Sequence, residues 1–166
     1  FYVFRSMVNY TIPSNYGCMI PIKIIAPEGL IVNAVRPAAV AGGNVETSQR
    51  IVDVLYGALS KAMPDKVPAA SGGTMNNTTF GGTHPDTGEQ FAYYETVACG
   101  MGARPDRDGI DGIHTHMTNS MNSPVEVLEN QLPVRLRKYG FRRGTGGKGK
   151  FKGGDGTDKR YEFLTN

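Results

Sequence analysis

The stretch from Gly42 to Arg50 constrains this chain most, because two glycines and a group of polar side chains lead directly into an amphipathic segment. From residue 51 onward, apolar side chains recur every three or four positions, which predicts a helix over residues 45–62. Asn44 is the expected N-cap, since its side-chain oxygen can accept a backbone N–H of the first turn. The expected core-facing residues of this helix are Ile51, Val52, Leu55, Leu59 and Ala62.

The start of this helix also has the chemistry of a binding site. The first turn of a helix leaves backbone N–H groups unpaired, and the neighbouring Gly42 and Gly43 allow another group to approach them closely. A carboxylate, a phosphate or a substrate carbonyl fits such a place. A helix start that is merely well capped has the same sequence pattern, and both interpretations remain open at this point.

The length and composition are those of a globular domain with many turns. The chain has 166 residues, of which 39% are hydrophobic and 20% charged, and this is enough for one domain with a core. The 22 glycines predict many turns and few long helices. The sequence begins at Phe1 and ends within a strand-like run from Arg160 to Leu164, so we expect a segment of a longer polypeptide or a processed chain.

The charge is distributed unevenly. The net charge is +3, and residues 135–152 contain eight basic residues and no acidic one. Such a run is typical of a solvated face, with contact to a polyanion as the second interpretation, and we expect no nucleic-acid partner. Cys18 and Cys99 form no disulfide framework, which predicts a reducing cytoplasm. No apolar stretch is long enough to cross a bilayer, and a signal peptide is not apparent.

The remaining pattern predicts an α+β fold of mixed sheets with antiparallel hairpins around one main helix. Residues 1–8 have the spacing of a helix. Alternating β-branched residues predict one hairpin over Ile20–Asn33 and a second over Thr78–Val97. Ser123, Pro124 and Glu126 have the order of a capped helix start, and that helix should end near Gln131. Two further strands are expected over Val134–Tyr139 and Tyr161–Leu164, joined by the glycine-rich loop of residues 144–156.

Several polar residues in glycine-rich segments are candidates for chemistry. His114 and His116 are two positions apart and would share one face of a strand. A pair of histidines can hold a metal, but the required third ligand is not evident, so hydrogen bonding or substrate positioning is the alternative role. Arg104 could bind a carboxylate or phosphate, and otherwise it is a surface arginine. Asn76 and Asn77 could line a polar pocket, or they satisfy backbone groups in a tight loop.

One glycine-rich segment resembles a nucleotide-binding loop only superficially. Gly144 and the later Gly149-Lys150 pair have the spacing of a P-loop. Phe151 then occupies the position where Ser or Thr must reach Mg²⁺, and no helix is predicted to follow. We therefore reject a nucleotide site here and predict a basic hairpin loop.

Long motifs in a fixed order make the chain resemble the hydantoinase B family over nearly its whole length. These motifs are Ala41–Asp53, Gly73–Asn77, Tyr93–Thr96, Gly100–Arg104, His114–Asn119 and Gly153–Gly156. The family includes the B-type subunits of N-methylhydantoinases, the carboxyl-terminal half of ATP-dependent 5-oxoprolinase, and the corresponding subunits of acetone and acetophenone carboxylases. The resemblance implies that residues 1–166 are an internal segment of a hydantoinase B/oxoprolinase-type domain.

What the resemblance implies is ATP-dependent amide chemistry shared between two subunits. A hydantoinase A-type partner would bind ATP and phosphorylate the oxygen of a hydantoin, 5-oxoproline or related lactam. The B-type subunit would then complete ring opening, because a phosphate ester leaves more readily than an amide oxygen and the intermediate must be shielded from bulk water. The resemblance equally allows a subunit of a ketone carboxylase, and a non-catalytic scaffold is the third interpretation.

The resemblance also implies cofactors that lie mostly outside this segment. The Asp- and His-containing metal-binding segments of the family lie upstream of Phe1, so we expect no fully ligated metal within residues 1–166. A divalent metal, either Mn, Zn or Fe, would be held mainly by those segments, ATP would bind the A-type partner, and the segment alone would be inactive. We expect a cytoplasmic hetero-oligomer that acts on a small cyclic amide and contacts no membrane.

The motifs yield one prediction about the site. We expect eight side chains to converge on a single polar cleft. His114, His116 and Arg104 are the candidate catalytic residues, with a histidine as acid or base and arginine compensating anionic charge. The candidate substrate-binding residues are Asn44, Thr47, Arg50, Asn76 and Asn77. The alternative is that all eight residues only stabilise loops.

Overall fold

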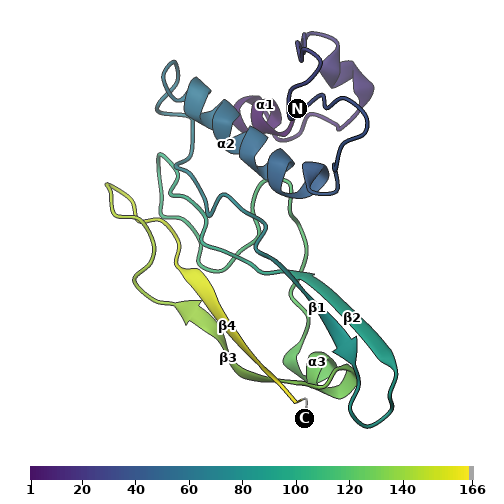
Figure 1. Cartoon of the computed structure of the whole chain (residues 1–166). Coiled ribbons are helices and arrows are strands. Elements are labelled where there is room, and N and C mark those ends of the chain that lie inside the picture. Colours follow the sequence, from purple (N-terminus) through teal and green to yellow (C-terminus); the bar gives the residue numbers. More distant parts are fainter. Residues whose placement is uncertain (165–166) are drawn as a thin grey trace.

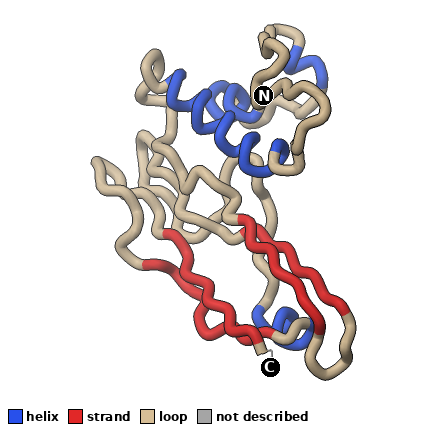
Figure 2. Tube along the Cα trace, viewed as in Figure 1, coloured by secondary structure: helices blue, strands red, loops and turns tan. Residues whose placement is uncertain are grey.

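A computed structural model describes residues 1–164 and shows α1 (Tyr2–Val8) and α2 (Ser48–Leu59) at one end of the molecule, two β-hairpins with α3 (Val125–Gln131) at the other and a layer of loops between them (Figures 1 and 2). The strands are β1 (Asn77–Thr83), β2 (Gln90–Thr96), β3 (Val134–Arg142) and β4 (Gly156–Phe163). The predicted α+β class is confirmed. Within residues 1–164, no helix is both long and apolar enough to cross a bilayer.

Helix α2 is the predicted main helix, but it covers Ser48–Leu59 instead of residues 45–62, and its start and its buried face differ from the prediction. A π-helical turn (Gly43–Thr47) precedes it, with Gly42 in the N-cap position and no side-chain capping bond. The backbone N–H of Ser48 instead donates to the carbonyls of Gly43 and Val45. The prediction that Asn44 caps the helix is therefore wrong, because continuous helical turns carry the hydrogen bonds through this point.

The core of the helical end forms where α2 packs against α1. Val52 and Tyr56 of α2 are buried with Val3 and Val67, and Leu59 is partly buried beside them. Ile51 and Leu55 are 41% and 38% exposed, so the prediction that they belong to the core is wrong in this structure. The apolar residues of α2 occupy two faces, and α1 covers only the face that carries Val52 and Tyr56.

One of the two predicted hairpins is present and the other is not. Strands β1 and β2 pair in antiparallel fashion from Asn77 opposite Thr96 to Thr83 opposite Gln90, which confirms the hairpin near residues 78–97. Residues 20–33 form no ladder, and only an isolated bridge joins Leu30 to Asn33 across a tight turn. The alternating β-branched residues of this segment have no partner strand within residues 1–164. A strand-like sequence pattern was therefore not enough to form a hairpin there.

The carboxyl-terminal hairpin is longer than predicted. Strand β3 begins at Val134 as expected but continues to Arg142, and β4 begins at Gly156 instead of near Tyr161. Helix α3 ends at Gln131 as predicted, whereas Ser123 makes no capping bond to it. The Ser123 hydroxyl instead accepts a hydrogen bond from Tyr93 on β2, so tertiary packing uses the side chain that the capping pattern assigned to the helix.

A buried ion pair and an aromatic cluster join the two hairpins. Lys159 of β4 contacts Glu95 of β2 at 2.6 Å, and both side chains are at least 96% buried. Burial alone would raise the pKa of Glu95, but hydrogen bonds from Lys159, Asn122 and Ser123 hold its pKa below the ordinary value. Beside this pair, the Phe80 ring packs against three aromatic rings, those of Tyr93, Tyr161 and Phe163, at centroid distances of 5.0–5.4 Å.

Two valines on α2 provide a matched test of the observed core. Val52 is 8% exposed, whereas Val54 is 69% exposed on the same helix. Val52→Ala should lower the free energy of unfolding by about 1.5–3 kcal/mol, because it removes buried methyl groups. Val54→Ala should change it by less than about 0.5 kcal/mol. Denaturant unfolding of both variants measures the difference, and equal losses would contradict the assignment of the buried face.

The Glu95–Lys159 pair yields a second prediction for stability. Glu95→Gln should cost about 3–5 kcal/mol, because it leaves the Lys159 ammonium buried without its counter-charge. Glu162→Gln is the control, since Glu162 pairs with Arg137 where both side chains are 40% or more exposed, and the loss there should stay within about 1 kcal/mol. A small effect of Glu95→Gln in denaturant melts would show that the pair contributes little.

Candidate functional site

The middle layer of the molecule consists of loop segments that lie unusually close together. Ala69 N–H donates to Ala103, Met101 N–H to Ile110, and Gly154 N–H to Met101, so segments around residues 69, 101, 110 and 154 form neighbouring rows. A Cβ on Gly102 would lie 1.9 Å from the Ala69 carbonyl oxygen. Only glycine fits such a crossing, and the layer holds the loops that bear Arg104 and His114 in place.

The glycine-rich loop between β3 and β4 is anchored to this layer by Asp155. The Asp155 carboxylate, whose side chain is 2% exposed, accepts hydrogen bonds from the backbone N–H groups of Gly144 and Gly146. These bonds, with Lys152 nearby, lower the pKa of Asp155 to about 2. Strands flank the loop on both sides, which agrees with rejecting a P-loop because a P-loop opens a helix.

His116 is held in a strained and enclosed position beside α2. Its backbone has a φ of 61°, a left-handed conformation that non-glycine residues adopt at a cost on the order of 1 kcal/mol. The ring lies between Tyr2 and Tyr56, with centroid distances of 5.9 and 5.7 Å. The ring atom Nε2 is 3.1 Å from Asp53 Oδ1, and the His116 side chain is only 5% exposed. Tertiary contacts from α1 and α2 therefore determine the orientation of this imidazole.

Three buried polar atoms in this region have no hydrogen-bond partner among the described residues. They are Nδ1 of His116, Nε2 of His114 and Oε1 of Gln49. Gln49 uses its other amide atom, Nε2, to donate to the carbonyl of Thr115, which lies between the two histidines. Burial lowers the pKa of His114, and the charge of Glu95 partly opposes that effect. Buried polar groups are nearly always paired in native proteins, so these three atoms make the region a candidate for binding a ligand or water.

A cavity of about 990 Å³ brings the three candidate catalytic residues together. It lies between α1, α2 and the loops of residues 101–119, and its wall includes Tyr2, Tyr56, Arg104, His114 and His116. Arg104 is exposed, and its guanidinium forms no ion pair within residues 1–164. The cavity therefore combines an available cation with two enclosed imidazoles.

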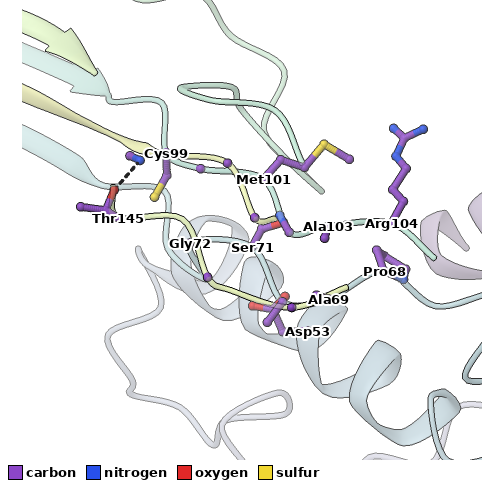
Figure 3. A pocket seen from close by; sticks show the side chains of 18 of the residues that line it. Asp53, Pro68, Ala69, Ser71, Gly72, Cys99, Met101, Ala103, Arg104 and Thr145 are labelled. Carbon is purple, nitrogen blue, oxygen red and sulfur yellow. Dashed lines mark hydrogen bonds between the residues drawn. The ribbon is translucent and has the colours of Figure 1, made fainter. Parts of the chain in front are cut away.

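A second cavity of about 1180 Å³ adjoins the first and shares Tyr56, Ser71, Met101 and Arg104 with it. Figure 3 shows its wall, in which Asp53 projects from α2 while the Arg104 side chain extends away from the other labelled residues. Asn76 lies in this second cavity, with a φ of 50° and an amide that donates to the Val97 carbonyl. Asp53 also lines this cavity, so its carboxylate lies between the two spaces.

The other candidate residues are not gathered at the first cavity. Arg50 lies beside Asp53, since the position that a Gly73 Cβ would take is 2.6 Å from Arg50 Nη1 and 3.3 Å from Asp53 Oδ2. Asn77 donates to Glu46 at 2.6 Å and accepts from Tyr94, so its amide is already satisfied. Asn44 and Thr47, in the π-helical turn, line neither of these cavities. The eight residues therefore do not line one cleft. The Asn77 segment is instead hydrogen-bonded to Glu46 at the start of the helix.

Sequence reasoning missed the polar and aromatic face of α2, on which Tyr56 lines both cavities and Asp53 lines the second. Gln49, Asp53 and Tyr56 are four and three positions apart, which places them on one face of the helix. Polar and aromatic side chains at that spacing, on the face opposite Ile51 and Leu55, were a detectable signal. Tyr2 and Ser6 of α1 complete this wall, where the Ser6 and Tyr56 hydroxyls are hydrogen-bonded. Their role depends on how α1 packs, and local sequence does not determine that packing.

The hydantoinase B/oxoprolinase family model matches residues 1–166. The chain belongs to the hydantoinase B/oxoprolinase family. It is 44% identical to the 5-oxoprolinase of Dictyostelium discoideum over 99% of its length and 43% identical to 5-oxoprolinase 1 of Arabidopsis thaliana over 98%. It is also 30% identical over 97% of its length to the B-type subunit of a putative D-/L-hydantoinase from a Pseudomonas species.

The match covers only a part of each of these relatives. The chain spans 12% of the length of each of the two 5-oxoprolinases and 26% of the Pseudomonas protein. Within residues 1–164 of this hydantoinase B-family chain, no group of three or more His, Cys, Asp or Glu side chains is arranged to hold a metal ion.

The close backbone layer yields a prediction with an internal control. Gly102→Ala should lower the free energy of unfolding by about 1–3 kcal/mol or more, because the added methyl would overlap the Ala69 carbonyl. Gly140→Ala places its methyl where nothing lies within 4 Å, so its effect should be within about 0.5 kcal/mol. Thermal or denaturant unfolding of both variants measures the contrast. Equal stability of the two variants would show that the neighbouring loop segments can move apart at no cost in free energy.

Proposed function

We propose that this chain forms part of the B-type subunit of an ATP-dependent hydrolase that opens hydantoin, 5-oxoproline or a related cyclic amide. In this proposal, a hydantoinase A-type partner binds ATP and phosphorylates the amide oxygen, and the cavity of this chain receives the activated ring. Membership of the hydantoinase B/oxoprolinase family supports the class of chemistry. The relatives named as 5-oxoprolinases and as a hydantoinase component support the class of substrate.

The observation that carries the proposal is Arg104, which has no ion-pair partner among residues 1–164 and lies in the same cavity as His114 and His116. The substrates of this class are anionic after phosphorylation, and 5-oxoproline also has a carboxylate. A guanidinium remains charged at every physiological pH and binds such oxygens through two parallel hydrogen bonds. Arg104 is thus the proposed anion-binding residue, and the cavity is large enough for a small ring with its phosphate.

The two histidines have different proposed roles. Burial lowers the pKa of His114 and so favours its neutral ring, which is proposed to hydrogen-bond a substrate amide through Nε2. His116 is the proposed acid or base. Asn76 and Arg50 are proposed to act from the adjoining wall, since Asn76 lines the second cavity and Arg50 lies against Asp53. Asn44, Thr47 and Asn77 are better explained as residues that organise the helix start and its contact with β1.

The cofactors of the proposed reaction do not fit this segment. The described residues offer no group of three metal ligands, and the cation Arg104 shares the cavity with both histidines. We therefore assign the divalent metal to other parts of the larger protein and derive no step through it. ATP is assigned to the A-type partner, because Phe151 and the strand β4 replace the serine and helix of a P-loop. The proposed assembly is a cytoplasmic hetero-oligomer.

The proposal is tested with the polypeptide that contains this chain, assembled with an A-type subunit or domain. Ring opening of 5-oxoproline and of hydantoin should require ATP. Arg104→Ala should lower kcat/KM by about 10²-fold, because the anionic intermediate loses its charged partner. Arg107→Ala is the control, since Arg107 is exposed and paired with Asp106, and it should leave kcat/KM unchanged.

Two outcomes of this experiment would contradict the proposal. ATP-dependent carboxylation of acetone or acetophenone without ring opening would favour the carboxylase interpretation. The absence of both activities in an assembly that forms normally would favour a scaffold. An unchanged kcat/KM for Arg104→Ala would remove Arg104 from the site while leaving the reaction class intact.

A further inference from the structure

The carboxylate of Asp53, which lines the second cavity, and the imidazole of His116, which lines the first, form an oriented pair where the two cavities adjoin. His116 Nε2 lies 3.1 Å from Asp53 Oδ1, the His116 side chain is 5% exposed and the Asp53 side chain is 17% exposed. Asp53 is on α2 and His116 is in a loop 63 positions later. The rings of Tyr2 and Tyr56 flank the imidazole, so its orientation is determined from three sides.

The hydrogen bond to Asp53 determines which ring nitrogen is available. A neutral imidazole carries one proton, and a carboxylate accepts it best at Nε2, the atom that contacts Asp53. Nδ1 then has a free lone pair, and it is the buried ring atom without a partner among residues 1–164. An acceptor that is unpaired and screened from water can bind the hydrogen of a ligand or receive its proton.

We propose that His116 is the general base of this cavity, with Nδ1 as the proton-accepting atom, and that Asp53 is its positioning residue. This inference rests on the proposed function, because it takes the activated cyclic amide as its substrate. Nothing in the sequence pattern assigned a role to Asp53. Many hydrolytic enzymes combine a nucleophile, a base that takes its proton and a carboxylate that orients the base.

The proposed step adds water across the carbon–nitrogen double bond of the phosphorylated amide. The water oxygen forms a bond to the ring carbon while its proton moves to His116 Nδ1. The electron pair of the carbon–nitrogen π bond moves to the ring nitrogen. The imidazolium, stabilised by the Asp53 carboxylate, then returns the proton to that nitrogen, so that His116 ends neutral and water has been added without another reactant.

Nδ1 of His116 is enclosed in this structure, so this step requires the cavity wall to move when substrate binds. In ligand-free structures, catalytic hydrogen bonds are often incomplete and form only in the substrate complex. Tyr2 flanks the imidazole and is itself 44% exposed at the edge of α1, so it can adjust when the cavity fills. The enclosure also strengthens the attraction between the imidazolium and the Asp53 carboxylate, because the local dielectric constant is low.

The first part of the test requires no catalytic activity. Long-range proton–nitrogen NMR of the 166-residue chain reports which ring nitrogen of each histidine carries the proton. His116 should show a protonated Nε2 and an unprotonated Nδ1 near neutral pH. Asp53→Asn should weaken this preference, whereas Asp86→Asn, in the exposed turn between β1 and β2, should not affect it. A protonated Nδ1 in the unaltered chain would overturn the proposal.

The second part measures catalysis in the complete assembly with its A-type partner. Asp53→Asn and His116→Asn should each lower kcat by about 10²-fold or more and change KM little. Asparagine is chosen at residue 116 because it tolerates the left-handed backbone found there. Asp86→Asn should retain full kcat, and the thermal melting temperatures of all variants establish that folding is preserved.

The two proposals fail in distinguishable ways. If the assembly opens cyclic amides with ATP but Asp53→Asn and His116→Asn retain normal kcat, the base assignment is wrong and the proposed function stands. If the assembly opens no cyclic amide, the proposed function fails and the proton-transfer step fails with it. In that case the NMR result alone decides whether Asp53 orients His116.

Discussion

Close packing of backbone segments in the middle layer is the constraint on which the rest of the structure depends. Where the loops of residues 69, 102, 110 and 154 cross, carbonyl oxygens occupy the volume that a Cβ would need, so glycine is required. Backbone hydrogen bonds between neighbouring rows then replace the ladder of a regular sheet. This layer connects the helical end to the two hairpins and supports the loops that carry Arg104 and His114, so backbone hydrogen bonds hold one wall of the candidate cavity although it is built from loops.

Helix α2 contributes residues both to the core of the helical end and to the candidate site. Val52 and Tyr56 bury their side chains against α1, while Asp53 on the same side of the helix contacts His116. Burial of the apolar residues therefore determines where the carboxylate lies. The left-handed backbone at His116 adds strain, and the contacts with Asp53, Tyr2 and Tyr56 hold the residue in that conformation. Strain retained at a residue with an unpaired buried nitrogen is characteristic of functional positions.

The fold could be predicted where local pattern and tertiary packing agree. The main helix, the hairpin of β1 and β2, and the start of β3 follow from periodicity and turn residues, and each is present. The hairpin expected at residues 20–33 is absent because strands need partners, and none of residues 1–164 supplies a partner strand there. Asn44 and Ser123 have the residue types of helix caps, but in the structure a π-helical turn and the Tyr93 hydroxyl replace those interactions.

The sequence by itself determined the family, the α+β class and the residue types of the site, because long ordered motifs and short-range periodicity are properties of the chain alone. It also indicated Arg104, His114 and His116, which share one cavity wall. Only the tertiary structure decided which face of α2 is buried, that Asn77 is satisfied by Glu46, and that Asp53 contacts His116. These outcomes depend on contacts between residues 30 or more positions apart, and such contacts arise from packing of the whole chain, which local periodicity does not encode.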